Sequence, residues 1–256
     1  MRSKRQAVIF IHGLRGDSHG LLDIANELPQ DRYEAITLDL PGYGNNPALS
    51  NSTTDSYADW LHKYIEEKKI QNPIIVGHSM GSIIASAYLS KYPDDTSSKA
   101  VFLSPIFRSG PKRLKNKITC VLVMGGLKLL VPKLRYKLLK SHFISFSISH
   151  TLTCDRSKQK YIDEQHYKYS ENFASAASLM RDIKLSMRKQ TVIPDKKKLL
   201  FCVGDRDRVT DVKIVRETAK KHQIEYVEIA NTGHLINYER PKEIANAIVS
   251  FIEEKN

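Results

Sequence analysis

The sequence predicts an α/β fold with a mostly parallel, doubly wound sheet of about six strands and one helical insertion. Short β-branched apolar runs alternate with longer amphipathic stretches at both ends of the 256-residue chain, which is the pattern of strand–helix–strand units. Between Arg108 and Ile193 this alternation stops, and helical periodicity and basic residues replace it. We therefore expect a core of residues 1–107 and 198–256 and a basic helical lid of residues 108–197.

The expected strands are the apolar runs, and the expected helices lie between them. The strands are Ala7–Ile11, Ala35–Leu40, Ile74–His78, Ala100–Ser104, Leu199–Val203 and Glu225–Ile229. The helices are roughly His19–Leu28, Ser56–Lys69, Met80–Lys91, Asp211–His222 and Pro241–Glu254. Turn-forming residues at Gly110-Pro111 and Val192-Ile193-Pro194-Asp195 mark the two ends of the insertion.

The composition is that of an ordinary globular protein, with 41% hydrophobic and 27% charged residues. Cys120, Cys154 and Cys202 are an odd number of cysteines without the spacing of a zinc site, so we interpret them as isolated thiols in a reducing compartment. The apolar run Ala7–Ile11 is far too short for the core of a signal peptide. We therefore expect a cytoplasmic protein.

The formal charge of +12 is confined to one segment. Residues 108–197 hold 20 Lys and Arg against 6 Asp and Glu, whereas the rest of the chain holds 20 against 22. The simplest interpretation is a solvated helix face. An anionic membrane surface or an acidic substrate would use the same charges. Charge alone also fits nucleic acid, but the chain has no recognition motif for it, so we expect no nucleic-acid partner.

The sharpest chemical signal is Gly77-His78-Ser79-Met80-Gly81, which follows an expected strand and precedes an expected helix. A serine on so tight a turn projects its hydroxyl above the sheet, and the flanking glycines let the backbone pass closely. G-x-S-x-G alone is a weak pattern, and a purely structural turn is the alternative. The strand–turn–helix context favours a nucleophile at Ser79.

A serine hydroxyl needs a base, and the base needs an orienting acid. Downstream, one expected strand ends at Asp205-Arg206-Asp207, and the next is followed by Asn231-Thr232-Gly233-His234. Both loops follow the carboxyl ends of strands, the edge where ligands gather in open α/β sheets. His234 is therefore the candidate base, although a structural histidine is the alternative interpretation. His12, His19 and His78 are weaker candidates.

At this point the chain resembles the α/β-hydrolase superfamily. The resemblance rests on four motifs in order: His12-Gly13, Asp39-Leu40-Pro41-Gly42-Tyr43-Gly44, the Ser79 turn, and the late Asp and His loops, the last of which continues as Gly-His-Leu-x-x-x-Glu-Arg-Pro. It covers residues 6–109 and 198–254 closely and the insertion only by position. Within it, the pattern G-x-x-D favours Asp207 as the acid, with Asp205 as the alternative. The position after the Ala100–Ser104 strand, where relatives can carry the acid, has no carboxylate.

The resemblance implies a set of roles around this triad. The backbone N–H groups of Met80 and Leu14 would form the oxyanion hole, and His12 and Gly13 would shape the oxyanion loop. No metal or organic cofactor is implied. Apolar side chains of Val121–Leu134 and Phe143–Leu152 would line a pocket for an acyl chain, amid basic residues at Lys112, Arg113, Lys115, Lys117, Lys133, Arg135, Lys137 and Lys140. The run Ile118–Val131 is too short to span a bilayer and is expected to be a lid helix.

The expected function is a serine carboxylic-ester hydrolase, esterase-like or lipase-like, that works through an acyl-serine intermediate. Monoacylglycerols and lysophospholipids fit the apolar lid, and peripheral contact with an anionic membrane fits its charge. Two alternatives stay open. One is a lyase of the same fold that resembles the menaquinone-pathway enzyme and takes an acidic substrate. The other is a hydrolase-like receptor or binding protein with little turnover.

Overall fold

The computed structural model describes residues 5–107, 134, 137–138, 141–170, 181–182, 184–186, 189–195 and 197–254, with the side chains of 166–170 left aside. Several sequence predictions lie outside these residues: Gly110-Pro111, Ile118–Val131, Cys120, and the basic residues Lys112, Arg113, Lys115, Lys117, Lys133, Arg135 and Lys140. The division of the chain into a core and a lid of residues 108–197 therefore stays a prediction.

The six predicted strands form one parallel sheet in the order β2-β1-β3-β4-β5-β6. Their bounds are β1 Gln6–Ile11, β2 Tyr33–Leu38, β3 Ile74–His78, β4 Lys99–Leu103, β5 Lys198–Gly204 and β6 Glu225–Ile229. Every adjacent pair runs parallel, so all six carboxyl ends meet at one edge. The predicted α/β class is confirmed.

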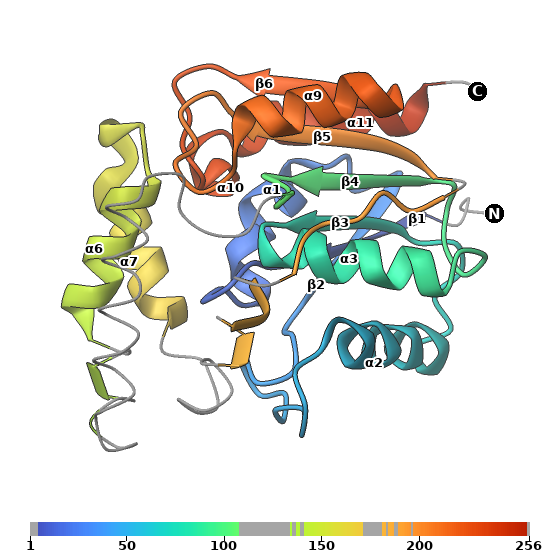
Figure 1. Cartoon of the computed structure of the whole chain (residues 1–256), viewed down its shortest axis with the longest axis horizontal. Helices are drawn as coiled ribbons and strands as arrows, with labels where there is room; N and C mark the ends of the chain where they lie inside the picture. The colour runs from blue at the N-terminus through green and yellow to red at the C-terminus, as the bar shows by residue number, and fades with distance from the viewer. Residues whose placement is uncertain are drawn as a thin grey trace.

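Helices cover both faces of the sheet. One face carries α2 (Thr54–Glu67), α3 (Met80–Lys91) and α9 (Val212–His222), and the other carries α1 (Leu22–Glu27) and α11 (Pro241–Glu253). Two further helices, α6 (His142–Leu152) and α7 (Gln159–Ser170), stand beyond the carboxyl ends of the strands (Figure 1). Short elements complete the described chain: η1 (Ser18–Leu21), η2 (Arg156–Lys158) and α10 (Ile236–Glu239).

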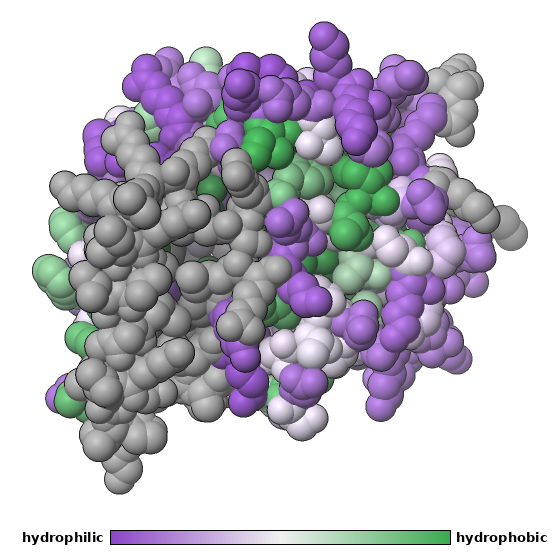
Figure 2. Space-filling view, viewed as in Figure 1, coloured by the Kyte–Doolittle hydropathy of each residue, from purple (hydrophilic) through white to green (hydrophobic). Residues whose placement is uncertain are grey.

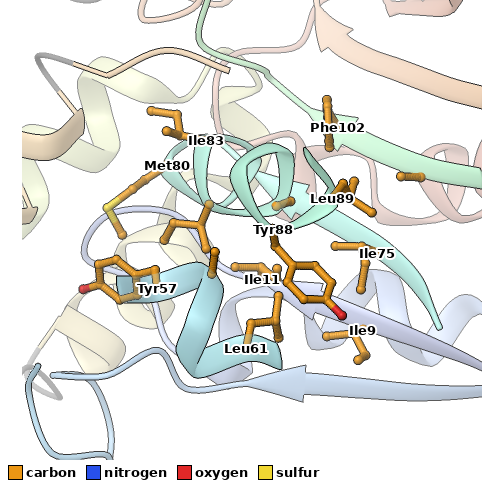
Figure 3. Packing of buried hydrophobic residues seen from close by; sticks show 14 of the residues in the cluster. Ile9, Ile11, Tyr57, Leu61, Ile75, Met80, Ile83, Tyr88, Leu89 and Phe102 are labelled. Carbon is orange, nitrogen blue, oxygen red and sulfur yellow. The ribbon is translucent and has the colours of Figure 1, made fainter. Parts of the chain in front are cut away.

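The core lies between the sheet and these helix layers. On one face, Ile9, Ile11 and Ile75 of the strands pack against α3 and α2 side chains such as Tyr88 and Leu61 (Figure 3), and all five are fully buried. Burying one large apolar side chain contributes about 1.5–3 kcal/mol. A second apolar cluster on the opposite face holds β1 between two buried layers. The strand ends are therefore fixed in space by packing on both sides.

Most element boundaries differ from the prediction by one or two residues, and three of the differences have a clear physical cause. β2 ends at Leu38 rather than Leu40, because its partner β1 ends at Ile11 and Ile11 pairs with Leu38. The Leu40 N–H donates instead to the His12 ring. The expected His19–Leu28 helix opens as the 3-10 turn η1 before α1, and α2 begins at Thr54, after a capping box between Thr53 and Ser56.

The length and the hydropathy of a helix decide whether it can cross a bilayer. None of the helices that the structure describes combines the length and the apolar composition needed to cross a membrane.

Candidate active site

Ser79 sits between β3 and α3 on a backbone with φ 54° and ψ −116°. Such a left-handed conformation is strained for a residue with a Cβ. The flanking glycines allow the turn: a Cβ on Gly77 would lie 2.5 Å from the Gly81 carbonyl oxygen, and one on Gly81 would lie 2.2 Å from that of Ile11. The Ser79 N–H donates to the Leu103 carbonyl at 2.9 Å. Backbone contacts thus hold the serine at the carboxyl edge of the sheet.

The structure brings the three predicted triad residues together. His234 Nε2 lies 2.9 Å from Ser79 Oγ, and its Nδ1 lies 2.8 Å from Asp207 Oδ2. Because the Asp207 carboxylate accepts from Nδ1, the proton of the neutral ring sits there and Nε2 can accept the serine proton. Asp207 and His234 are buried, at 6% and 4% exposure. A continuous line of hydrogen bonds therefore runs from a carboxylate to a hydroxyl.

The Asp207 carboxylate is fixed by more than the histidine. Its Oδ1 accepts from the N–H groups of Val209 and Thr210, each at 2.8 Å. Burial alone would raise the pKa of Asp207, but the charge of His234 and these donors outweigh burial and hold the pKa below its ordinary value. Asp205, the alternative acid, is exposed and accepts from the Thr232 N–H at 3.1 Å. The geometry thus separates the two aspartates that the sequence left open.

The backbone around His234 is clamped by a residue that sequence reasoning did not single out as a site residue. Glu239, which is fully buried, accepts from the N–H groups of Gly233, Cys154 and Asp155 at 2.9, 3.0 and 2.6 Å. Burial raises the pKa of this carboxyl, although the three donors favour its ionised form. Its signal in the sequence was the Glu of the Gly-His-Leu-x-x-x-Glu-Arg-Pro stretch. Its contacts could not be inferred, because Cys154 and Asp155 are distant in the chain.

Helix α6 supplies the second half of this clamp. The His234 N–H donates to the Leu152 carbonyl at 2.8 Å. Gly233 passes so close to the end of α6 that a Cβ there would lie 2.3 Å from the same oxygen. The position of the candidate base therefore depends on residues 152–155 as well as on the core.

His78 also contacts the candidate base, which sequence reasoning did not foresee. Its Nε2 donates to the His234 carbonyl at 3.0 Å, and the two ring centroids are 5.2 Å apart. Burial, with a smaller contribution from the nearby His234 charge, lowers the pKa of His78 to about 3. His78 therefore stays neutral and acts as a hydrogen-bond donor to the His234 loop.

The loop from His12 to Leu14 lies against the serine turn. A Cβ on Gly13 would lie 3.2 Å from the Ser79 Cβ. The His12 Nδ1 donates to the Gly13 carbonyl at 2.8 Å, and its Nε2 accepts from the Leu40 N–H at 3.1 Å. Burial lowers the pKa of His12, so the ring is a neutral brace. Met80, buried at the first turn of α3, and Leu14, half-buried, are the two predicted oxyanion donors.

Two buried polar contacts join the core to residues of the predicted lid. Arg15, next to this loop, donates from Nη2 to Ser145 Oγ of α6 at 3.1 Å, and burial lowers its pKa to about 10. On the other side, the Tyr57 hydroxyl of α2 donates to Asp182 Oδ1 at 2.9 Å. In the predicted pocket segment Phe143–Leu152, Phe143 and Phe146 are 73% and 42% exposed, and the pocket itself stays a prediction. Among the described residues, no group of three or more His, Cys, Asp or Glu could hold a metal ion.

Comparison with known proteins places this chain in a family. The family model described as "alpha/beta hydrolase fold" matches residues 6–241, which is most of the chain. The chain therefore belongs to the α/β-hydrolase family, and the resemblance given by the four motifs is confirmed. Among its relatives in this fold are proteins named as a lipase and as an esterase.

Individual relatives are distant or match over part of their length. The chain is 23% identical to "Lipase 3" of Moraxella sp. over 258 residues, 96% of this chain and 77% of that protein. It is 34% identical over 102 residues to a dihydrolipoyllysine-residue acetyltransferase component of the acetoin cleaving system of Cupriavidus necator, which is 40% of this chain but only 27% of that protein. The esterase of Exiguobacterium antarcticum superposes with a TM-score of 0.76 at 16% identity, covering 97% of this chain and 92% of that one. These matches support the fold, and the reaction and the substrate of this chain stay proposals.

Proposed function

We propose that this protein is a serine carboxylic-ester hydrolase in which Ser79 is the nucleophile, His234 the general base and Asp207 the acid that orients the base. The observation that carries the proposal is the buried hydrogen-bond line from Asp207 Oδ2 through the His234 ring to Ser79 Oγ. The strained turn at Ser79 supports it, because strain of this kind persists only where the surrounding structure enforces it.

Acylation would proceed by proton transfer and addition. Ser79 Oγ attacks the ester carbonyl carbon while its proton moves to His234 Nε2, and the carbonyl oxygen becomes an oxyanion. Collapse of this intermediate breaks the bond to the alcohol, which leaves with the proton from His234. Asp207 stabilises the imidazolium during both steps. Water then attacks the acyl-serine by the same route and releases the carboxylic acid.

The oxyanion would be held by the backbone N–H groups of Met80 and Leu14. Met80 is at the first position of α3, where unpaired N–H groups and the helix dipole favour negative charge. The contact of Gly13 with the Ser79 side chain brings the neighbouring Leu14 close to the same turn. Loss of one such donor costs about 3 kcal/mol in catalysis.

The substrate we propose is a small-molecule ester with an apolar acyl chain, such as a monoacylglycerol or a lysophospholipid. The lipase and esterase relatives support this class. Phe143 and Phe146 of α6 are 73% and 42% exposed, so the chain itself does not bury them.

The test combines a fluorophosphonate probe with p-nitrophenyl esters of increasing chain length. We expect the probe to label Ser79, and the Ser79→Ala variant to lose labelling and about 10⁴-fold or more of its kcat. Matched labelling without any ester cleavage would favour the same-fold lyase or the binding protein. Full esterase activity in Ser79→Ala would overturn the nucleophile assignment.

A further inference from the structure

Helix α6 buries two serines and exposes two phenylalanines, while its Ile144, Ile148 and Leu152 are half-buried. Its fully buried side chains are the two serines Ser145 and Ser149, whereas Phe143 is 73% exposed and Phe146 42% exposed. A helix packed on a core normally buries its apolar face and exposes its polar one. Burial within this chain therefore does not explain the two phenylalanines.

The two buried serines of α6 make polar contacts with the rest of the chain, and its last residue makes an apolar one. Ser145 Oγ accepts from Arg15, and Ser149 Oγ donates to the Phe146 carbonyl and to the carboxylate of Asp163 in α7. At its end, Leu152 packs against the small cluster of Ile162, Leu235 and Tyr238. These contacts fix the rotation of the helix, so the phenylalanines are held outward.

The exposed apolar side chains continue beyond α6. Among the described residues, four of the seven large apolar side chains with high exposure lie between positions 134 and 146: Leu134, Leu138, Phe143 and Phe146. We call these four residues the apolar stripe. Hydrophobic side chains show at the left edge of the molecule in Figure 2, on the side where Figure 1 draws α6. Gathered exposure of this kind marks an interaction surface.

The charge of the sequence segment that contains the apolar stripe indicates its partner. Lys137 lies within the stripe and is exposed, and residues 108–197 carry a surplus of 14 positive charges. Aromatic and aliphatic side chains beside Lys and Arg are the composition of surfaces that lie on anionic lipid. A protein partner would not need so large an excess of one sign within one segment, whereas an anionic bilayer attracts every cation near it.

We propose that the apolar stripe docks the protein on the surface of an anionic membrane. Phe143 and Phe146 enter the boundary between headgroups and acyl chains, and Lys137 contacts lipid phosphate. The opposite side of the same helix contacts Arg15 and, through Leu152, the His234 loop. Docking thus sets the candidate site beside the bilayer. This binding does not require ester hydrolysis, so it is separable from the proposed function.

The experiment is sedimentation with vesicles of phosphatidylglycerol and phosphatidylcholine mixed in equal parts, with pure phosphatidylcholine vesicles for comparison. We expect binding to the mixed vesicles that weakens with added salt. The double variant Phe143→Ser/Phe146→Ser should bind about tenfold more weakly or worse. Lys137→Glu should lower binding roughly fivefold or more.

Matched controls use exposed residues outside the apolar stripe. Val192→Ser, which removes a 48% exposed apolar side chain, and Lys220→Glu on α9 should bind vesicles as the parent protein does. All variants should keep the parent circular dichroism spectrum and cleave p-nitrophenyl acetate in solution at the parent rate. Equal binding to both vesicle types, or unchanged binding by the double variant, would overturn the proposal. The proposal would also be overturned if the double variant differed from the parent protein only in self-association, measured by analytical ultracentrifugation. A second copy of the chain would then cover the apolar stripe.

Discussion

Ser79 Oγ and His234 Nε2 are 2.9 Å apart, yet different interactions keep the two residues in position. Ser79 joins two fully packed elements: all of β3 is buried, and α3 buries Met80, Ile83 and Ile84 against the sheet. His234 lies in a loop that is held by polar groups, namely the Leu152 carbonyl, the Glu239 carboxylate and the His78 ring. The nucleophile therefore depends on apolar packing, whereas the base depends on hydrogen bonds and on α6.

This difference predicts that single polar substitutions act mainly on the base. Asp207→Asn should show the largest effect, a loss of about 10⁴-fold in kcat for p-nitrophenyl butyrate, because an amide at this position no longer favours the ring tautomer that accepts the serine proton. Probe labelling of Ser79 should slow in parallel. Asp205→Asn is the matched control and should keep parent activity. An equal loss in the two variants would contradict the assignment of the acid.

A second variant tests the clamp without touching the triad. Glu239→Gln replaces a buried carboxylate that accepts three N–H groups by an amide that can satisfy fewer of them. We expect the free energy of unfolding to fall by about 2 kcal/mol. Displacement of the His234 loop should lower kcat by about tenfold to a hundredfold, with KM nearly unchanged. Urea unfolding and steady-state kinetics measure the two effects.

The control for this clamp is Glu243→Gln, an exposed glutamate on α11. It should match the parent protein in both measurements. If Glu239→Gln lowers stability but leaves kcat and its pH profile unchanged, Glu239 supports the fold and does not position the base.

The smallest expected effect is a pH dependence of stability from His78. Its pKa of about 3 in the folded protein lies below that of an unfolded histidine, near 6.5, so the unfolded chain binds more protons in between. Stability contributed by neutral His78 is then present above pH 6.5 and is lost as the pH falls toward 3. His78→Gln keeps an N–H donor but cannot titrate. Between pH 7 and pH 5 it should lose about 2 kcal/mol less stability than the parent protein.

Urea unfolding at the two pH values measures this difference. If His78→Gln lost as much stability between pH 7 and pH 5 as the parent protein, His78 would not titrate differently in the folded and unfolded states. The conclusion that hydrogen bonds hold the His234 loop would then lose the contribution of His78.

The sequence predicted the parts of this molecule that depend on local pattern. The strand, turn and helix around Ser79 are continuous in the chain, so their periodicity and glycines could be interpreted directly. All six strands were predicted. The bounds of α3, Met80–Lys91, were also predicted, because the helix begins directly after the serine turn. The end of β2 was missed, because the length of an edge strand depends on its single partner.

The clamp around His234 could not be predicted, because it joins residues that are far apart. His78 contacts the His234 carbonyl across 156 positions, and Glu239 reaches Cys154 across 85. Helix α10, which carries Glu239, has four residues and leaves no periodicity to detect. The exposure of Phe143 and Phe146 could not be predicted either, because it depends on how α6 is rotated against the core. The oxyanion donors, the lid boundaries and the cytoplasmic location remain predictions.

One pair of contacts at the edge of the sheet bears on how this enzyme class diversifies. The Thr191 N–H donates to the Ile106 carbonyl at 2.6 Å, and the Ile106 N–H donates to Thr191 Oγ1 at 3.0 Å. These two hydrogen bonds join the residues that follow β4 to the residues that precede β5. The two strands are neighbours in the sheet. A segment inserted between Ile106 and Thr191 therefore leaves the strand order of the sheet unchanged. Exchange of the segment between Ile106 and Thr191 would then change the surface beside the candidate site, while the strand ends that carry Ser79, Asp207 and His234 stay in place.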